Sequence, residues 1–142
     1  MARRVVLDTN VVVAALRSRR GAAAVVLLGA GTGQFEFCLS VTLFFEYESA
    51  LKRPESGVRV PVAAIDDILD HLAAVGRQQR IFFLWRPSLP DPADDHVLEV
   101  AVAGRCDAIV TYNRRDFRGA DRFGIRIMSP PQFLLELRSE KP

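Results

Sequence analysis

Cysteine is scarce in this sequence. Among its 142 residues only Cys38 and Cys106 are cysteines, and both lie inside apolar runs. Neither stands near a histidine at the spacing of zinc ligands. Two such thiols favour buried, reduced side chains in a cytoplasmic protein and argue against a disulfide framework or a structural metal. We therefore expect the fold to depend on its hydrophobic core.

Long hydrophobic runs are also missing. No apolar stretch reaches the roughly 20 residues that a transmembrane helix needs. Arg3 and Arg4 precede an apolar run, as in a signal peptide, but Asp8 and Asn10 interrupt that run after only three residues. We expect neither a signal peptide nor a membrane-spanning segment, and hence no membrane partner.

The apolar content that is present, 49% of the residues, suits one globular domain. A chain of this length buries about 70% of its unfolded surface without covalent cross-links. The sequence contains no internal repeat and no low-complexity tract. We predict a single domain over residues 1–138, a flexible loop at 53–61 and a disordered tail at 139–142.

Apolar runs rich in β-branched residues alternate with segments of helical periodicity. The runs predict strands at 4–7, 36–40, 81–85, 107–111 and 125–128. Helices are predicted at 12–16, 22–28, 41–51 and 65–75, after Asp94, and from Pro131 to about Leu137. This alternation predicts an α/β fold in which helices cover both faces of a parallel sheet.

An acid stands where the first predicted strand should end. In the run Val5-Val6-Leu7-Asp8-Thr9-Asn10-Val11, Asp8 has apolar residues on both sides. A carboxylate in such a place is costly unless it is paired, hydrogen-bonded or bound to a metal. The functional crevice of such a fold lies beyond the carboxyl ends of the strands. We expect these polar residues to converge there: Asp8, Glu46, Asp94, Asp95, Asn113 and Asp116.

Carboxylate ligands without histidine or cysteine are those that Mg²⁺ or Mn²⁺ prefers. A divalent ion held in this way can provide a nucleophilic water and offset charge on a phosphoryl group, which fits phosphodiester hydrolysis. Taken singly, each acid also has an ordinary explanation. Glu46 could be an exposed helix residue, and Asp94 or Asp95 could cap a helix.

Four segments in order carry a resemblance to a known family. They are Val6-Leu7-Asp8-Thr9-Asn10; Ser40 followed by Glu46-Tyr47 and Leu51; Asp91-Pro92-x-Asp94-Asp95 followed by Leu98 and Ala101; and Ile109-Val110-Thr111-x-Asn113-x2-Asp116-Phe117. Together they resemble the PIN-domain ribonucleases, and most closely the VapC-type toxins of toxin–antitoxin pairs. With the closing run from Ile127 to Leu134, the resemblance covers almost the whole chain.

This resemblance implies a three-layer α/β/α sandwich with a mostly parallel, five-stranded sheet. It also implies a Mg²⁺- or Mn²⁺-dependent endoribonuclease, the toxin of a type II toxin–antitoxin pair. The metal ligands it assigns are Asp8, Glu46 and Asp94. Asp95 competes for the third place, but Ala101 lies seven residues after Asp94. We prefer Asp94 because a small residue two turns later matches the close packing of this helix in the family.

The fourth acidic position departs from the commoner pattern of the family, because Asn113 stands two residues after Thr111, where many relatives carry an acid. An amide can orient water but brings no charge. Asp116 either supplies the missing carboxylate, as a fourth catalytic residue, or caps the next turn, and both interpretations stay open. The residues expected to orient the carboxylates are Thr9, Asn10, Asp95, Thr111 and Asn113.

Charge is unevenly distributed, although the net charge is only +2. Residues 87–104 hold four acids and no lysine or arginine, whereas residues 105–126 hold six arginines. An acidic site beside a basic surface suits a metal centre that acts on a polyanion. We expect Arg17, Arg114 and Arg115 to bind RNA, single-stranded or structured, with Arg19, Arg20 and Arg118 nearby. Surface solubility is the ordinary alternative for each arginine.

Two other functions are compatible with parts of the pattern. With Asn113 in the fourth position, the chain could be a catalytically degenerate PIN-like module that binds RNA or protein. A phosphoryl-transfer enzyme with Asp8 as covalent nucleophile is disfavoured. It usually needs a further acid close after the nucleophile, where Asn10 stands, and a lysine near the sheet edge, whereas the only lysines are Lys52 and Lys141.

A toxin needs a cognate antitoxin protein. The predicted helices at 41–51 and 65–75 have apolar faces larger than one sheet face needs. These faces suit a groove for an antitoxin helix and a homodimer interface, although packing within the monomer explains them equally well. His71 and His96 are expected at the surface, with His96 adjoining the acidic motif.

Overall fold

The structure is a computed structural model, and it describes residues 3–81 and 89–139. Its strands are β1 (Arg3–Leu7), β2 (Phe35–Leu39), β3 (Arg77–Gln78), β4 (Ala108–Val110) and β5 (Arg126–Met128). The α-helices are α1 (Thr9–Arg17), α2 (Ala22–Gly29), α3 (Val41–Lys52), α4 (Val62–Val75), α5 (Asp95–Ala103) and α6 (Pro130–Ser139). Short 3-10 helices are η1 (Pro54–Ser56), η2 (Pro92–Asp94), η3 (Arg114–Phe117) and η4 (Ala120–Phe123).

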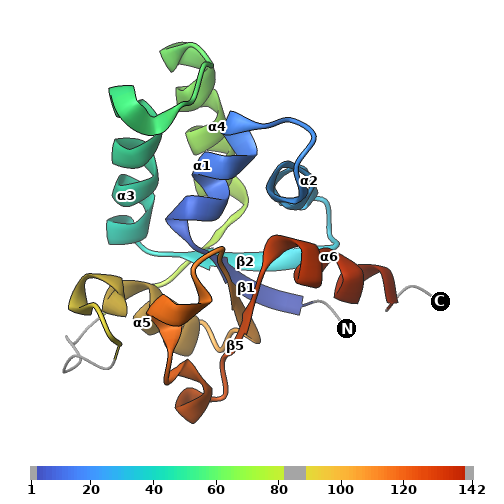
Figure 1. Cartoon of the computed structure of the whole chain (residues 1–142), viewed down its shortest axis with the longest axis vertical. Helices are drawn as coiled ribbons and strands as arrows, with labels where there is room; N and C mark the ends of the chain where they lie inside the picture. The colour runs from blue at the N-terminus through green and yellow to red at the C-terminus, as the bar shows by residue number, and fades with distance from the viewer. Residues whose placement is uncertain (1–2, 82–88, 140–142) are drawn as a thin grey trace.

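The strands form one parallel sheet in the order β3-β2-β1-β4-β5. The chain adds β2 and β3 on one side of β1 and then returns to add β4 and β5 on the other. Right-handed crossovers therefore place the helices before and after this return on opposite faces of the sheet. In Figure 1, α1 to α4 and α6 lie on one side of the sheet and α5 lies on the other. The predicted α/β fold with a parallel, five-stranded sheet is confirmed.

The central strands end in fully buried apolar residues, because helices cover both faces of the sheet. These residues include Val5, Val6, Leu7, Phe37, Leu39, Ile109 and Val110. β1 and β2 are each followed by a polar residue that caps the next helix. Asp8 accepts a hydrogen bond from the Thr9 backbone N–H, and Ser40 Oγ accepts one from the Leu43 N–H. Each strand therefore delivers a polar side chain to the same edge of the sheet.

The third strand differs from its prediction. The structure has β3 at Arg77–Gln78, paired with Cys38 and Leu39 of β2, and Ile81 has no regular structure. The rest of the predicted strand, 82–85, lies outside the described residues. β3 follows α4 directly after Gly76, where a side chain would collide with Leu39. Two exposed polar residues at a sheet edge carry no apolar signal, which is why sequence periodicity missed them.

The other predicted elements are present with slightly different ends. The predicted loop at 53–61 contains η1, and α6 extends through Ser139. Ser139 was predicted to begin a disordered tail but is helical; residues 140–142 lie outside the described part. The helix starts with a capping box: Gln132 Oε1 accepts the Ser129 N–H at 2.9 Å, and the Gln132 N–H donates to Ser129 Oγ at 3.3 Å.

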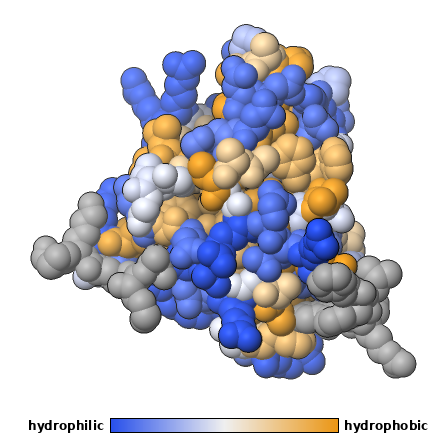
Figure 2. All heavy atoms as spheres, turned by 180° about the vertical axis from the view of Figure 1, so that it is seen from behind, coloured by the Kyte–Doolittle hydropathy of each residue, from blue (hydrophilic) through white to orange (hydrophobic). Residues whose placement is uncertain are grey.

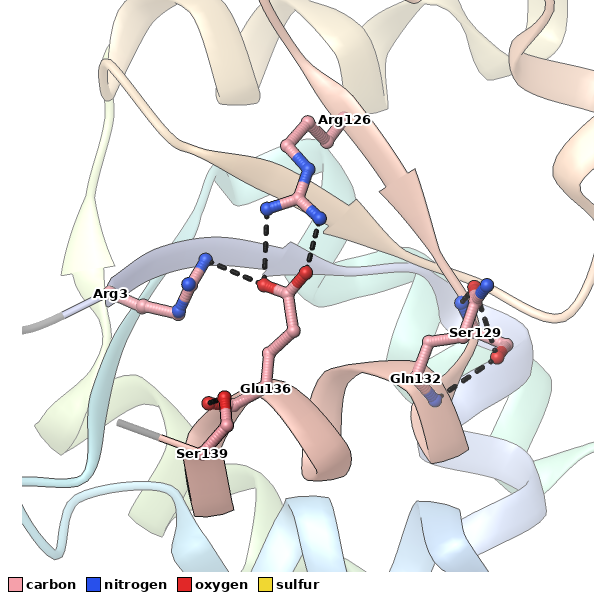
Figure 3. A network of polar contacts seen from close by, with 6 residues as sticks. All are labelled: Arg3, Arg126, Ser129, Gln132, Glu136 and Ser139. Atoms are coloured by element: carbon pink, nitrogen blue, oxygen red, sulfur yellow. Dashed lines mark hydrogen bonds and ion pairs between the residues drawn. The ribbon is translucent and has the colours of Figure 1, made fainter. Parts of the chain in front are cut away.

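Glu136 holds α6 across the amino ends of two strands. Figure 3 shows its carboxylate between Arg3, at the start of β1, and Arg126, at the start of β5. Arg126 binds both oxygens of Glu136, and Arg3 lies 2.9 Å from one of them. This cluster lies at the opposite end of the strands from Asp8.

The molecular surface mixes polar and apolar residues, which Figure 2 shows interspersed over the rear face. Large exposed apolar side chains include Leu28 on α2 and Phe45 on α3. Helices α3 and α4 pack against each other, so part of the apolar surface predicted for a partner is used within the chain. None of the described helices is long and apolar enough to cross a membrane.

Candidate active site

A cleft of about 330 Å³ opens at the carboxyl ends of β1 and β4. These strands are neighbours, yet the chain reaches β4 only after building β2 and β3, so the order of strands reverses between them. Ligand sites of open α/β sheets form at such a reversal. The residues that line the cleft are Asp8, Thr9, Asn10, Val13, Arg17, Glu46, Asp94, Asn113 and Asp116. The structure thus brings most of the predicted site residues together.

Asp8 lies directly after β1 and is only 7% exposed. Its Oδ1 accepts a hydrogen bond from the Thr9 N–H at 2.9 Å, and its Oδ2 accepts one from Thr111 Oγ1 at 2.8 Å. Burial raises the pKa of Asp8, and the charges of Glu46 and Asp116 raise it further, whereas the two hydrogen bonds oppose the shift. The carboxylate is therefore held firmly in a site that disfavours its negative charge.

Thr111 connects Asp8 to its neighbours. While its hydroxyl donates to Asp8, it accepts hydrogen bonds from Asn10 Nδ2 at 3.2 Å and from the Asn113 N–H at 3.0 Å. Asn10 Oδ1 in turn accepts the Tyr112 N–H. Asn10 and Thr111 thus form one hydrogen-bonded chain with Asp8, and Asn113 joins it through its backbone.

Glu46 faces the cleft from the second turn of α3. Its Oε1 accepts a hydrogen bond from Thr9 Oγ1 at 2.6 Å, and its Oε2 lies 2.5 Å from His96 Nε2. The hydrogen bond with His96 lowers the pKa of Glu46; burial opposes this effect, and Thr9 adds to it. Both carboxylate oxygens of Glu46 are therefore already bonded within the chain.

His96 was predicted at the surface, but the structure half-buries it in α5 against Glu46. Burial alone would lower its pKa, yet the hydrogen bond and charge of Glu46 raise it overall. Its Nδ1 is buried and has no hydrogen-bond partner in the part of the chain that the structure describes. The position directly after Asp94-Asp95 was the only sequence signal for this contact.

The structure separates the two adjacent acids at the start of α5. Asp94 lines the cleft, and burial raises its pKa to about 6, with the charges of Asp116, Asp8, Asp91 and Glu46 adding to the shift. Asp95 is 7% exposed, does not line the cleft, and accepts the Leu89 N–H at 3.0 Å. Asp95 therefore anchors the chain before α5, and Asp94 is the acid that faces the other carboxylates.

Asn113 and Asp116 both line the cleft, so neither is excluded from it by the fold. Asp116 lies in η3, close enough for its charge to raise the pKa of Asp8 and of Asp94. Asn113 supplies an amide at the mouth of the same cleft. Position 113 has no carboxylate, but Asp116 brings one to the same cleft.

Arginines line two further hollows, one of which shares Arg17 with the cleft. Arg17 lines the cleft and also a hollow of about 420 Å³ that contains Arg19 and Arg59. The helix η3, which brings Asp116 to the cleft, also carries Arg114 and Arg115 into a hollow of about 640 Å³ that contains Arg118. Arg17 donates from Nε and Nη2 to the Ser56 carbonyl at 2.9 and 2.6 Å, so part of its guanidinium serves to hold η1.

Among residues 3–81 and 89–139, no three histidine, cysteine, aspartate or glutamate side chains lie close enough together to hold a metal as they stand. Both carboxylate oxygens of Glu46 are engaged by Thr9 and His96. The donors still fit a hard divalent cation, because all are carboxylates. Part of the pKa rise at Asp8 and Asp94 is also mutual repulsion, which a cation would relieve.

A family model matches the greater part of this chain. The family is described as PIN domain, and its model matches residues 4–115. The matched region is well over half of the chain, contains Asp8, Glu46 and Asp94, and ends one residue before Asp116. A comparison with curated proteins found no match.

Proposed function

This chain belongs to the PIN-domain family, and on that basis we propose that it is a metal-dependent endoribonuclease that hydrolyses phosphodiester bonds of RNA. PIN domains are generally nucleases and typically use divalent metals. The observation that carries the proposal is the cleft at the reversal of strand order, into which Asp8, Glu46, Asp94 and Asp116 all project. The charges of these acids raise the pKa of Asp8 and of Asp94, and a bound cation would relieve that repulsion.

In this proposal Asp8, Glu46 and Asp94 hold Mg²⁺ or Mn²⁺. When bound, the ion would activate water for attack on phosphorus and offset the charge that develops on the phosphate. Asp116 is proposed as the fourth acid, because its charge acts on Asp8 and Asp94. Asn113, which lines the same cleft, is proposed to orient substrate or water through its amide.

The contacts within the chain prepare these carboxylates. Thr9 and Thr111 fix one oxygen each of Asp8, so its remaining lone pairs have a defined direction. Thr9 and His96 do the same for Glu46. Hydrogen bonds that orient ligands in this way typically change metal affinity about 10- to 100-fold. The cleft therefore holds oriented ligands that one cation could draw together.

RNA is proposed as the substrate because two of the segments that line the acidic cleft, α1 and η3, also carry arginines into neighbouring hollows. In this proposal Arg59 and Arg115 bind phosphates of one strand, and the carboxylates act on a bond between them. Guanidinium groups bind phosphate oxygens in pairs, and such contacts give salt-dependent affinity without sequence preference. This arrangement favours cleavage within a strand over removal of terminal nucleotides.

A circular single-stranded RNA tests the proposal directly, since it has no ends. Purified protein should linearise it with Mn²⁺ and leave it intact with a chelator. Asp8→Asn should abolish cleavage, whereas Asp70→Asn, an exposed acid on α4, is the matched control and should cleave normally. Linear product that forms with chelator present, or with Asp8→Asn, would contradict the metal-nuclease assignment.

The arginine hollows are tested by binding to a fluorescent single-stranded RNA in the Asp8→Asn protein, which separates binding from cleavage. Arg59→Ala and Arg115→Ala should each weaken binding and lower the salt dependence by about one ion. Arg138→Ala on α6 is the control and should bind like its parent. Equal affinity for all three variants would remove the two hollows from the RNA path.

A second candidate is a PIN domain that binds RNA or protein without cutting. It is favoured by the separation of the carboxylates, because Glu46 is engaged by Thr9 and His96, and no three acids are gathered in the described residues. Titration of the protein with Mn²⁺ in a calorimeter distinguishes the two. Binding that is lost with Asp94→Asn supports the nuclease, and RNA binding with no Mn²⁺ uptake supports the binding module.

The biological role that we propose is that of a type II toxin, as in VapC-type proteins, with an antitoxin protein as partner. A largely apolar groove of about 560 Å³ lies between α1, α2 and α4, lined by Leu16, Leu27, Leu28 and Ile68 among others. Its size suits an amphipathic helix of an antitoxin, and a homodimer would compete for the same surface. Expression should arrest growth, and the product of the adjacent gene should relieve the arrest. Unimpaired growth with active protein would argue against the toxin role.

A further inference from the structure

Two thiols from distant parts of the sequence lie beside Gly104, at the end of α5. Cys38 of β2 is fully buried, and Cys106, which precedes β4, is 5% exposed. A Cβ atom on Gly104 would lie 2.7 Å from Cys38 Sγ and 3.3 Å from Cys106 Sγ. Both sulfur atoms therefore border the same small volume. Gly104 has an ordinary helical backbone, with φ −83° and ψ −1°, so its lack of a side chain serves the two sulfurs rather than the chain conformation.

The surroundings polarise the pair. The hydrogen bond from the Cys106 thiol lowers the pKa of Cys38; burial opposes this, and the positive charge of Arg4 assists it. Gln79 Nε2 also donates to Cys38 Sγ at 3.8 Å. The same thiol contact, with burial, raises the pKa of Cys106. The contact therefore makes the two sulfurs unequal, because it lowers the pKa of Cys38 and raises that of Cys106, and such asymmetry is found in reactive cysteine pairs.

The pair lies on the segments that lead to the proposed active site but does not line the cleft. Cys38 lies two residues before Ser40, whose hydroxyl caps α3, and α3 is the helix that carries Glu46. The Cys106 N–H donates to the Ala101 carbonyl at 2.8 Å, near the end of α5. A covalent link here would join β2 to the end of α5. It would thereby connect the strand that leads into α3, which carries Glu46, to the helix that carries His96.

We propose that Cys38 and Cys106 are a redox-sensitive pair that closes into an intramolecular disulfide when the protein meets a peroxide. The Cys38 sulfur attacks one peroxide oxygen and the O–O bond breaks. One water is released, and Cys38 becomes a sulfenic acid. The Cys106 sulfur then attacks Cys38 Sγ, forming the S–S bond and releasing a second water that takes the Cys106 proton. Two thiols give two electrons to one peroxide, and a dithiol reductant reverses the step.

The test treats the folded, full-length protein with hydrogen peroxide, denatures it in excess N-ethylmaleimide and measures its mass. The expected product takes up no maleimide, has lost two hydrogen atoms and yields one peptide pair linked through Cys38 and Cys106. Dithiothreitol should restore two reactive thiols. Cys106→Ser is the control, and in that variant Cys38 should stop at sulfenic acid or oxidise further without an internal link.

Three outcomes would overturn the proposal: two maleimide adducts after peroxide, independent oxidation of each sulfur to sulfinic acid, or linkage only between separate molecules. The principal measurement uses the unmodified sequence, so an unstable variant does not affect it. The readout is also independent of RNA and of metal, and failure of the nuclease assignment would leave it unchanged.

Discussion

Thr111 Oγ1 donates a 2.8 Å hydrogen bond to Asp8 Oδ2 and so joins the carboxyl ends of β4 and β1 at the reversal of strand order. The two residues are distant in the sequence, yet each directly follows a strand of the sheet centre. The same hydroxyl accepts hydrogen bonds from Asn10 and Asn113. A single side chain thereby orients the proposed first metal ligand and two of its neighbours.

Thr111→Val should weaken both the fold and the site. The variant keeps the shape of the side chain but leaves a buried carboxylate oxygen and two N–H donors without their partner, which costs about 1–3 kcal/mol of unfolding free energy. Cleavage should fall at least about 10-fold, since Asp8 loses an orienting bond. Thr111→Ser retains the hydroxyl and is the control. Urea denaturation and RNA cleavage rates measure the two effects, and a Val variant as active as the Ser variant would contradict the orienting role.

His96 should act through Glu46. His96→Ala removes the 2.5 Å contact to Oε2, so Glu46 loses one of its two orienting bonds, and the apparent Mn²⁺ affinity should drop about 10-fold. His96→Gln can still donate to Glu46 and should recover part of the loss. Calorimetric Mn²⁺ titration distinguishes this from general destabilisation. An unchanged affinity in His96→Ala would show that Thr9 alone positions Glu46.

Asp94 and Asp95 should give opposite results when each is replaced by alanine. Asp94→Ala should abolish cleavage with unchanged or slightly higher stability, because Asp94 is repelled by the other acids of the cleft. Asp95→Ala leaves the buried Leu89 N–H without its acceptor and should cost about 1–3 kcal/mol while cleavage persists below the unfolding temperature. Thermal denaturation and cleavage at low temperature measure the pair. The reverse pattern would make Asp95 the metal ligand.

Gly104→Ala should destabilise the fold, although alanine normally favours a helical position by about 1 kcal/mol. The added methyl group would lie 2.7 Å from Cys38 Sγ, and such overpacking typically costs about 1–3 kcal/mol. In a Cys38→Ala background the sulfur is gone and the penalty should shrink. A double-mutant cycle by urea denaturation measures this coupling, and additive effects would show that the sulfur does not require the glycine.

Much of the fold and the site follows from local patterns. Buried parallel strands are continuous apolar runs, so β1, β2 and β4 were predicted to within one residue at each end. Asp8 was found because a carboxylate is conspicuous after such a run. The choice of Asp94 over Asp95 as the acid that faces the cleft also agrees with the structure, although its role as a ligand stays a prediction.

The missed features depend on packing between distant elements. β3 has only two exposed residues, Arg77 and Gln78, and pairs with β2 through its backbone. The contact of His96 with Glu46 depends on how α5 lies against α3, which neither helix encodes alone. The meeting of Cys38 and Cys106 depends on the whole sheet. Periodicity identifies the buried face of an element but not the side chain that it meets.

Glu136 should contribute stability that depends on pH. The bond to Arg126, with Arg3 assisting, lowers the pKa of this carboxylate in the folded state below its usual value of 4.5. The contribution is therefore complete above the unfolded-state pKa and is lost as the pH falls through the folded-state pKa. Because these ion pairs lie at the molecular surface, Glu136→Gln should cost only about 0.5 kcal/mol at pH 7, and less at high salt. Urea denaturation at pH 7 and below pH 4 should show the difference from the parent protein shrinking at low pH.

Glu55→Gln, whose carboxylate is exposed on η1, is the control and should match the parent protein at both values. A constant difference across this range would show that Glu136 acts through packing of α6 rather than through its charge.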